Sequence, residues 1–182
     1  MARKESVTYE DLLNAAFNMT REQGISEVTA RKLATYTGCS TQPIFRHFEN
    51  MEECHDCVFD EALKFFDKFY DDFPIKSLVP FVNLGLAYIA FAMAEPNLFA
   101  FLFAMPNNKG MNMYSLLNAR NNIVINEMNI AKREGVSRPE QIFMKMWMLI
   151  HGAACMTLTK DFDLNEAETK KQLEEAYRAF IK

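Results

Sequence analysis

The segment TARKLATYTGCSTQPIFRHF, residues 29–48, decides the fold of the N-terminal part of this chain. Its spacing is that of two short helices joined by a tight turn. Ala34 is small enough for the two helices to approach closely, Gly38 permits the turn, and Ile44 seats the second helix on the first. This pattern predicts a helix-turn-helix, whose second helix lies in the major groove of DNA.

Length and composition fit a mostly helical protein. The chain has 182 residues, of which 49% are hydrophobic, with only six glycines and six prolines. The polar segment MARKESVT at the N-terminus is unlike a secretory signal peptide. The longest apolar run, residues 84–94, is shorter than the roughly 20 residues of a membrane helix. We therefore expect a cytoplasmic protein with no membrane partner.

Charge is distributed unevenly along the chain. Residues 1–48 hold six Lys/Arg and five Asp/Glu, residues 49–72 hold two and nine, and residues 73–182 hold twelve and ten. The acidic residues are thus concentrated just after the predicted DNA-reading helix. Bulk electrostatics does not by itself indicate nucleic-acid binding here.

Helix signals recur along the whole chain, and no alternating strand pattern competes with them. The pattern predicts an all-α fold of about nine helices. Helices are expected from residue 8 to before 24, over 29–38, 40–48 and 51–73, on both sides of a break at 95–96, and over 111–134, 137–160 and 165–181. The predicted caps are Thr8 with Asp11, Thr29, Ser40, Asn50 with Glu53, and Ser137 with Glu140.

These elements predict two domains. Residues 1–50 form a DNA-binding domain with the helix-turn-helix at about 29–48. Residues 51–182 form a ligand-binding and dimerisation domain, and the helix over 51–73 connects the two.

The N-terminal part resembles the TetR family of bacterial transcriptional regulators. The resemblance rests on LLNAAFNMTREQG, VTARKLATYTGCS and IFRHFENMEE, which follow the family pattern without a gap. The C-terminal half resembles the domain type named for its Trp-His-Gly signature, here Trp147, His151 and Gly152. The resemblance implies a homodimeric repressor that binds double-stranded operator DNA and is released by a small molecule.

Several side chains of the motif are candidates for contact with DNA. Gln42 suits a bidentate contact with adenine, and Thr41 and Pro43 suit thymine methyl groups or phosphate. The full set of candidate DNA-binding residues is Thr29, Arg31, Ser40, Thr41, Gln42, Pro43, Phe45, Arg46 and His47. Simpler interpretations exist for some of them, since Phe45 could be a core residue like Ile44, His47 an ordinary surface histidine, and Thr29 only a helix cap.

Two positions depart from the family pattern. Phe45 stands where the family usually has a tyrosine whose hydroxyl reaches a phosphate, and Met51 stands where it usually has a lysine. Two phosphate contacts per subunit are then missing, and we expect weaker and less salt-dependent DNA binding than in a typical member. The alternative hypothesis is a dimeric small-molecule-binding protein whose DNA binding is weakened or lost.

Aromatic residues and methionines dominate residues 77–113 and could line a cavity for a small apolar effector, although core packing explains each one singly. The candidate ligand-binding residues are Phe81, Tyr88, Phe91, Phe99, Phe103, Met113, Trp147 and His151. Apolar residues on two faces of the helix over 137–160 and on the last helix predict a dimer interface that includes Met144, Met148, Leu173, Tyr177 and Phe180.

The four cysteines show no disulfide spacing. Cys54 and Cys57 share one helix face and could bind a soft metal or act as redox thiols, but a closed zinc site needs four ligands. We therefore expect no metal and no cofactor. The sequence also lacks a catalytic arrangement, such as a phosphate-binding glycine loop or a nucleophile elbow, and we expect no enzymatic activity.

Overall fold

The computed structural model describes residues 7–106, 112–118 and 122–182. Helices occupy most of the described chain, and these residues include no strand, which confirms the all-α prediction. The chain divides into two compact units. Unit 1 runs to Phe65 and also includes Asn97–Leu102, whereas unit 2 comprises Phe66–Pro96 and the chain from Phe103 onward.

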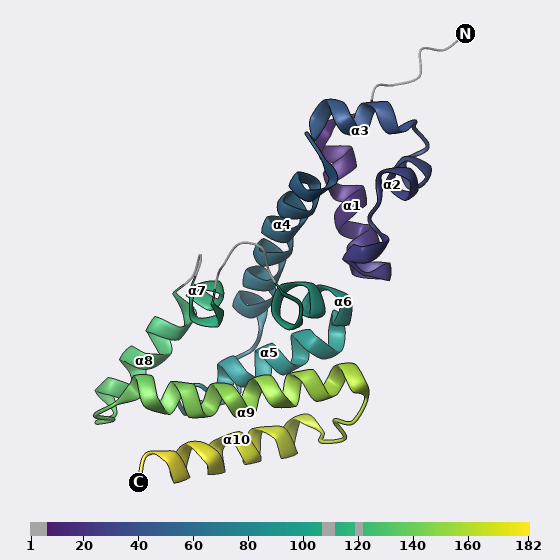
Figure 1. Ribbon diagram of the computed structural model, residues 1–182. Coiled ribbons are helices and arrows are strands. Elements are labelled where there is room, and N and C mark those ends of the chain that lie inside the picture. Colours follow the sequence, from purple (N-terminus) through teal and green to yellow (C-terminus); the bar gives the residue numbers. More distant parts are fainter. Residues whose placement is uncertain (1–6, 107–111, 119–121) are drawn as a thin grey trace. The chain divides into compact units, whose positions relative to one another are not determined.

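Unit 1 contains the helix-turn-helix (Figure 1). Its elements are α1 (Tyr9–Gln23), the 3₁₀ turn η1 (Ile25–Glu27), α2 (Ala30–Thr37), α3 (Thr41–His47) and the first part of α4 (Met51–Asp72). The predicted capping box at α1 is present, because the Thr8 hydroxyl accepts from the Asp11 backbone and the Asp11 carboxylate accepts from the Thr8 backbone. Thr29 caps α2, and Asn50 caps the first turn of α4 through the Glu53 N–H.

The core of unit 1 follows from the spacing of its apolar residues. Leu12, Leu33, Ile44 and Phe48 are buried together where α1, α2 and α3 meet. Gly38 ends α2 with φ +67°, a left-handed conformation that glycine adopts without steric cost. This turn sets the angle between α2 and α3.

The first turns of α4 belong to unit 1, so the units divide beyond the predicted boundary at residue 50. Cys54 and Val58 are buried in the same core as α1 to α3. His55 Nε2 donates a hydrogen bond to the Val28 carbonyl, 2.8 Å away, just before the start of α2. The histidine next to Cys54 therefore ties α4 to the helix-turn-helix.

A segment distant in sequence completes unit 1. Asn97, in α6 (Pro96–Phe99), donates from Nδ2 to the Arg21 carbonyl at 2.9 Å, in the last turn of α1. Phe101, in the π-helical turn η2 (Ala100–Ala104), meets the Phe59 ring of α4 edge-on at 5.5 Å between centroids. A short stretch of the predicted ligand-binding domain is thus built into the DNA-binding unit.

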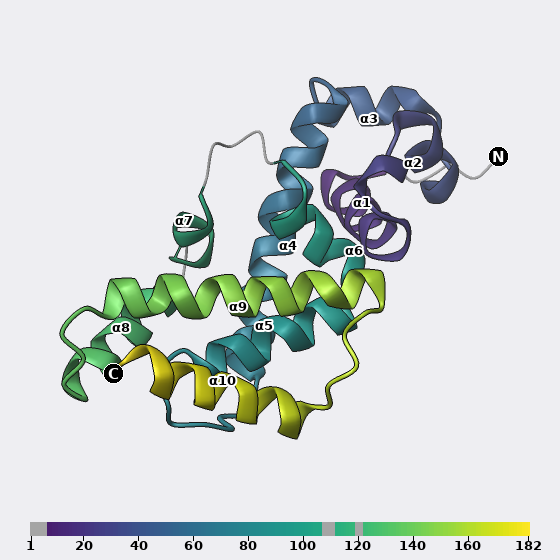
Figure 2. The same ribbon diagram turned by 60° about the horizontal axis from the view of Figure 1, so that its bottom comes forward.

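Unit 2 is built around α5 (Val82–Ala94), α9 (Pro139–Thr159) and α10 (Glu166–Phe180), which lie side by side (Figure 2). α7 (Met113–Asn118) and α8 (Ile123–Arg133) precede α9. Gly85 allows α5 to approach its neighbours, because a Cβ there would lie 2.9 Å from side-chain atoms of Ile150 and Leu173. Close packing of α5 against α9 and α10 depends on this glycine.

Two sequence predictions for unit 2 were wrong. The helix expected over 111–134 is two helices, and part of the connection lies outside the described residues. Asn122 has a left-handed conformation with φ 48°, and the Asn118 side chain accepts from the Val124 N–H at the start of α8. α9 begins at Pro139 with Arg138 as N-cap, so Ser137 does not cap it.

α9 is the one helix of the described chain that is by itself long and apolar enough to cross a membrane. The pair α5 with α6–η2 passes the same test only if a bend of 115° is allowed. A core helix has the same composition, and seven residues of α9 are buried, including Ile142, Met146 and Ile150. Packing within unit 2 accounts for this buried side of α9, whereas Met144 and Met148 are exposed.

Candidate DNA-binding surface and apolar ligand-binding region

The exposed face of α3 carries the predicted base-reading side chains. Phe45 follows Thr41 by four residues and Arg46 follows Gln42 by four, so these two neighbouring pairs share one side of the helix, and all four residues are exposed. Ile44 is fully buried on the opposite face. The structure thus presents a row of polar, apolar and cationic groups of the size that a major groove accepts.

The exposure of Phe45 differs from one interpretation of the sequence. Its side chain is 51% exposed, so its interpretation as a core residue is wrong, whereas that of Ile44 is confirmed. An exposed ring between Gln42 and Arg46 offers apolar contact but no hydrogen bond. It suits a thymine methyl group better than a phosphate.

The remaining predicted DNA contacts surround this face. Thr29 and Arg31 are exposed at the start of α2, and the Thr29 hydroxyl accepts from the Lys32 N–H at 3.4 Å. Ser40 is the exposed N-cap of α3, although within the described residues its side chain makes no capping hydrogen bond. Pro43 is half-buried, and His47 is exposed beside the Tyr9 ring.

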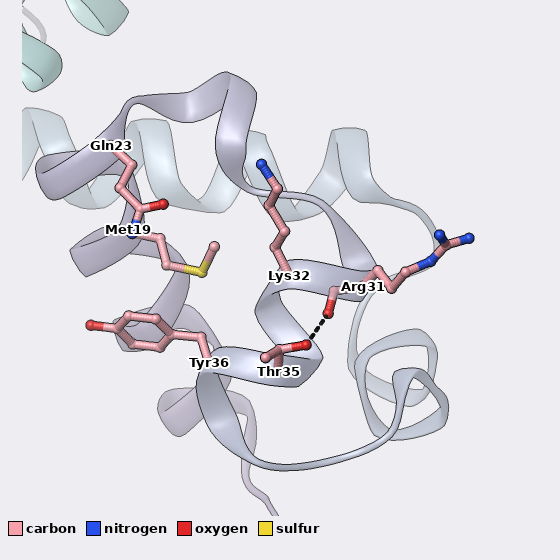
Figure 3. Close-up of a pocket in the computed structure, with 6 residues that line it drawn as sticks. All are labelled: Met19, Gln23, Arg31, Lys32, Thr35 and Tyr36. Carbon is pink, nitrogen blue, oxygen red and sulfur yellow. Dashed lines mark hydrogen bonds between the residues drawn. The ribbon is translucent and has the colours of Figure 1, made fainter.

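A small pocket of about 310 Å³ lies beside α2 (Figure 3). Lys32 and Tyr36 line it from α2 and Met19 from α1. The Arg31 side chain extends away from the pocket, while its carbonyl accepts from the Thr35 hydroxyl at 3.0 Å. Lys32 forms an ion pair with Glu27. The Arg31 guanidinium therefore projects toward solvent near the helix-turn-helix.

Met51 packs against the core of unit 1 and is half-buried. The first turn of α4 otherwise carries Glu52 and Glu53. The Glu53 carboxylate accepts from the Glu49 N–H. The beginning of α4 is thus acidic, and it lacks a cation at the position where the family pattern places a lysine.

The predicted ligand-binding aromatics form a connected cluster in unit 2. Tyr88 contacts Trp147 and Phe103, with ring centroids 4.8 and 5.0 Å apart. Phe81 joins this cluster through Phe143, which contacts Trp147. Met113 is half-buried in α7. Of the predicted set, only Phe99 belongs to unit 1.

Phe66, which was not among the predicted residues, lies at the centre of this cluster. Its ring meets Phe91, Phe103 and Tyr88 edge-on at 5.0, 5.1 and 6.1 Å. The sequence contained a signal for it, because Phe66 and Phe69 recur at helical spacing along α4 and Phe73 follows directly after the helix. A connecting helix therefore supplies part of the aromatic wall.

A buried carboxylate near the cluster was also missed. Glu127 of α8 is 8% exposed and accepts from the Phe81 N–H at the start of α5. Burial raises the pKa of Glu127 above its usual range, although the Phe81 hydrogen bond opposes the shift. Phe81 has φ 64°, a strained conformation for a phenylalanine, and this hydrogen bond helps to hold it.

Polar groups at the other side of the cluster are hydrogen-bonded in series. The Tyr88 hydroxyl lies 3.1 Å from His151 Nδ1, and His151 Nε2 lies 3.5 Å from Cys155 Sγ. Burial raises the pKa of Tyr88 and lowers that of His151. His151 is therefore a neutral imidazole at physiological pH.

The predicted dimer residues fall into two groups. Met144 and Met148 are exposed on α9, whereas Leu173 and Tyr177 are buried within unit 2 and are unavailable to a second subunit. Phe180 is half-buried under the Lys145 ammonium. The apolar stripe of α10 faces α5 and α9, so the prediction that Leu173 and Tyr177 lie in a dimer interface is wrong.

A groove of about 450 Å³ runs between α9 and α10. We call the exposed apolar residues of this region the α9–α10 surface. It comprises Met148, Leu149, Gly152, Met156 and Leu164, which line the groove, and Met144, one turn of α9 before Met148. Gly152 is exposed within it, and a Cβ at that position would have no atom within 4 Å.

Cys54 and Cys57 do not form the core of a closed metal site. Cys54 is fully buried, and burial raises the pKa of its thiol to about 12. A hydrogen bond with Cys57 raises the pKa of Tyr9 to about 12 as well. Across the described residues, no group of three or more His, Cys, Asp or Glu side chains could hold a metal ion.

The helix-turn-helix and its exposed α3 face define a DNA-binding transcriptional regulator. Residues 12–56 match the family model described as "Bacterial regulatory proteins, tetR family". Residues 81–180, more than half of the chain, match the model "Tetracyclin repressor-like, C-terminal domain". The chain belongs to the TetR family. The finer resemblance to the Trp-His-Gly type stays a prediction.

Solved structures share the fold at low sequence identity. A TetR-like transcriptional regulator from Rhodococcus sp. RHA1 is 12% identical, with a TM-score of 0.70 and 98% of both chains covered. A putative TetR family regulator from Vibrio parahaemolyticus is 18% identical, with a TM-score of 0.64 over 93% of this chain and 96% of that one. Comparison with curated proteins gives no match. TetR-family regulators are not enzymes, so the prediction of no enzymatic activity is confirmed.

Proposed function

We propose that this regulator is a cytoplasmic homodimeric repressor, released from a palindromic operator by a small apolar effector. The observation that carries the DNA part is the exposed α3 face of Thr41, Gln42, Phe45 and Arg46. In a dimer this face is presented twice, so a symmetric operator matches the symmetry of the protein.

Each contact on this face has a distinct expected role. Gln42 reads adenine in a half-site, Phe45 contacts a thymine methyl group, and Arg46 binds a phosphate. A side chain that reads a base changes specificity when it is removed. A side chain that binds a phosphate changes affinity for all sequences and the dependence on salt.

Selection of bound fragments from a random DNA pool tests the proposal. We expect an enriched palindrome, and its absence at low salt would overturn the DNA part. With the palindrome in hand, Gln42→Ala should cost about 1–3 kcal/mol per half-site at one base position. Arg46→Ala should weaken binding to all DNA sequences and reduce the slope of log affinity against log salt concentration by about one unit per half-site. Lys171→Ala, a charge removed from α10, is the matched control and should change neither.

The second subunit is proposed to cover the α9–α10 surface. Isolated exposed apolar residues are ordinary, but five of the six exposed residues of this surface line one groove, and Met144 lies one helical turn from them. Met156→Glu places a charge in the patch, and we expect it to yield monomers in analytical ultracentrifugation. Ile75→Glu, at a 78% exposed position outside the patch, is the control. A Met156→Glu variant that remains dimeric at micromolar concentration would refute this interface.

The effector is proposed to bind among the aromatic residues around Tyr88, Phe91, Phe103 and Trp147. α5 carries Tyr88 and Phe91, and the chain continues from α5 into Asn97, which hydrogen-bonds to α1. A ligand that shifts α5 would therefore pull on a segment built into the DNA-binding unit. In this way effector binding would bias the equilibrium between two orientations of the DNA-binding units in the dimer.

Asn97→Ala tests this coupling. The variant should keep operator affinity in the absence of effector but require more effector for release, because the link to α1 is removed. The matched control is Asn165→Ala, an asparagine of unit 2 that only caps α10. Equal effector sensitivity in Asn97→Ala and the wild type would contradict the proposed route.

A second candidate function is a small-molecule-binding dimer with weakened DNA binding. It is favoured by the Phe45 ring, which has no hydroxyl, and by Met51, which packs on the core beside two glutamates. Met51→Lys separates the two functions. Tighter binding at a palindrome already enriched by the wild type supports the repressor, whereas DNA binding that exists only in the variant supports the alternative.

A further inference from the structure

The outer side of α9 carries a row of soft donor atoms. Met144, Met148, His151 and Cys155 are separated by four, three and four residues, a spacing that places them on one helix face. Met144 and Met148 are exposed, and His151 and Cys155 are half-buried. Two thioethers, an imidazole and a thiol therefore follow one another along a solvent-accessible edge.

His151 and Cys155 already have the separation of two ligands of one metal ion. His151 Nε2 and Cys155 Sγ are 3.5 Å apart. Metal–sulfur and metal–nitrogen bonds of about 2.3 and 2.1 Å, meeting at about 110°, place the two ligand atoms about 3.6 Å apart. A metal ion could bind both atoms with little movement of either side chain.

The imidazole is held in the orientation that such a site requires. Nδ1 faces the hydroxyl of the buried Tyr88 at 3.1 Å, and the ring stacks on Trp147 with an interplanar angle of 21°. With the proton on Nδ1 donated to Tyr88, the lone pair of Nε2 is directed toward Cys155. A second residue that fixes the ring in this way is typical of metal-binding histidines.

The donor set discriminates among metals. Thiolate and thioether sulfur favour soft cations such as Cu(I), whereas Mg²⁺ and Ca²⁺ require oxygen ligands. Cys155 and His151 supply two ligands, and Met148, one turn before His151, can supply the third. All three ligands come from one helix, so no second chain has to supply a ligand.

We propose that Met148, His151 and Cys155 form a binding site for one Cu(I) ion per chain. In the binding step the Cys155 S–H bond breaks, a sulfur–copper bond forms and the thiol proton passes to water. No electron is transferred. The site lies at the edge of the α9–α10 surface, and Met148 belongs to both.

The exposure of the three residues supports this assignment. His151 and Cys155 are half-buried and Met148 is exposed, so a metal ion can reach all three from solvent. The other cysteine pair is less suitable, because Cys54 is fully buried.

Anaerobic titration of the full chain with Cu(I), in competition with a chromophoric Cu(I) chelator, tests the proposal. We expect one equivalent per chain with release of about one proton. Cys155→Ser should lower affinity at least about 100-fold, and His151→Gln and Met148→Leu should each weaken binding by about 10-fold or more. Tyr88→Phe removes only the hydroxyl that orients His151 and should weaken binding by about 10-fold.

Matched variants distinguish this site from other thiols. Cys57→Ser and Met156→Leu remove a thiol and a thioether elsewhere and should leave Cu(I) affinity unchanged. Circular dichroism of each variant establishes that the helices are intact. Retention of wild-type affinity by Cys155→Ser, or its loss in Cys57→Ser alone, would overturn the proposal, as would equal affinity in Met148→Leu and the wild type.

Discussion

Substitution of alanine for Gly85 should be less favourable to stability than the same substitution at Gly152. Gly85 lies inside α5, where an added Cβ would lie 2.9 Å from Ile150 and Leu173 atoms. Gly152 lies inside α9, where an added Cβ would meet nothing within 4 Å. Both substitutions gain about 1 kcal/mol from helix propensity, so this contribution cancels in the comparison. Overpacking costs about 1–3 kcal/mol at Gly85 alone.

The free energy of unfolding of Gly85→Ala should thus be about 1–3 kcal/mol lower than that of Gly152→Ala. For a chain of this size each kcal/mol corresponds to about 2–4 °C in melting temperature. Scanning calorimetry at equal protein concentration, with the oligomeric state measured beside it, gives the comparison. A Gly85→Ala variant that melts at or above the temperature of Gly152→Ala would refute the packing argument for α5.

Three further substitutions test single interactions. The pKa of Glu127 is raised in the folded state, so its stabilising contribution is fully present below the unfolded-state pKa of about 4.5 and is lost as pH rises through the folded-state pKa. Glu127→Gln should therefore make the free energy of unfolding less dependent on pH in this range, as measured by denaturant titrations at several pH values. An unchanged pH dependence would contradict this prediction. Asn165→Ala removes the capping box of α10 and should lower the free energy of unfolding by about 0.5–2 kcal/mol. Thermal melts that coincide with those of the wild type would contradict this prediction. Phe45→Tyr keeps the ring that contacts the thymine methyl group and adds a hydroxyl that can reach a neighbouring phosphate. It should tighten operator binding by about 0.5–1.5 kcal/mol per subunit in fluorescence anisotropy, and unchanged or weaker binding would contradict a phosphate within reach.

Local signals in the sequence predicted the DNA-binding unit well. Thr8 with Asp11, Thr29 and Gly38 set the ends of α1 and α2 through contacts within a few residues, so their positions could be read directly. The family pattern then identified the exposed face of α3. These features are determined locally, because caps and turns satisfy backbone groups close by in sequence.

Prediction was poorer where distant segments decide the environment of a side chain. Leu173 and Tyr177 form the same kind of apolar stripe as an interface helix, but α5 and α9 cover them. Phe45 and Ile44 are adjacent and equally apolar, yet only Ile44 is buried. Periodicity gives the faces of a helix, and it does not identify the neighbour that each face meets.

The candidate ligand and metal sites also combine residues that are visible in a local sequence pattern with residues brought in from distant segments. The concentration of aromatic residues on α5 was visible in the sequence, but Phe66 and the buried Glu127 come from α4 and α8. The spacing of Cys54 and Cys57 is visible in the sequence. The environment of His151 and Cys155 is not, because it includes Tyr88, which is 63 residues away from His151 in sequence. Only the folded chain brings these groups together.

The sequence by itself determined the helical class, the helix-turn-helix and the TetR family, because propensity, capping and turn chemistry act between near neighbours. The tertiary structure decided which side chains are free to meet DNA, ligand or a second subunit. It also placed Asn97 against α1, a contact between residues 76 positions apart. Such contacts depend on packing of whole helices, and no local pattern specifies them.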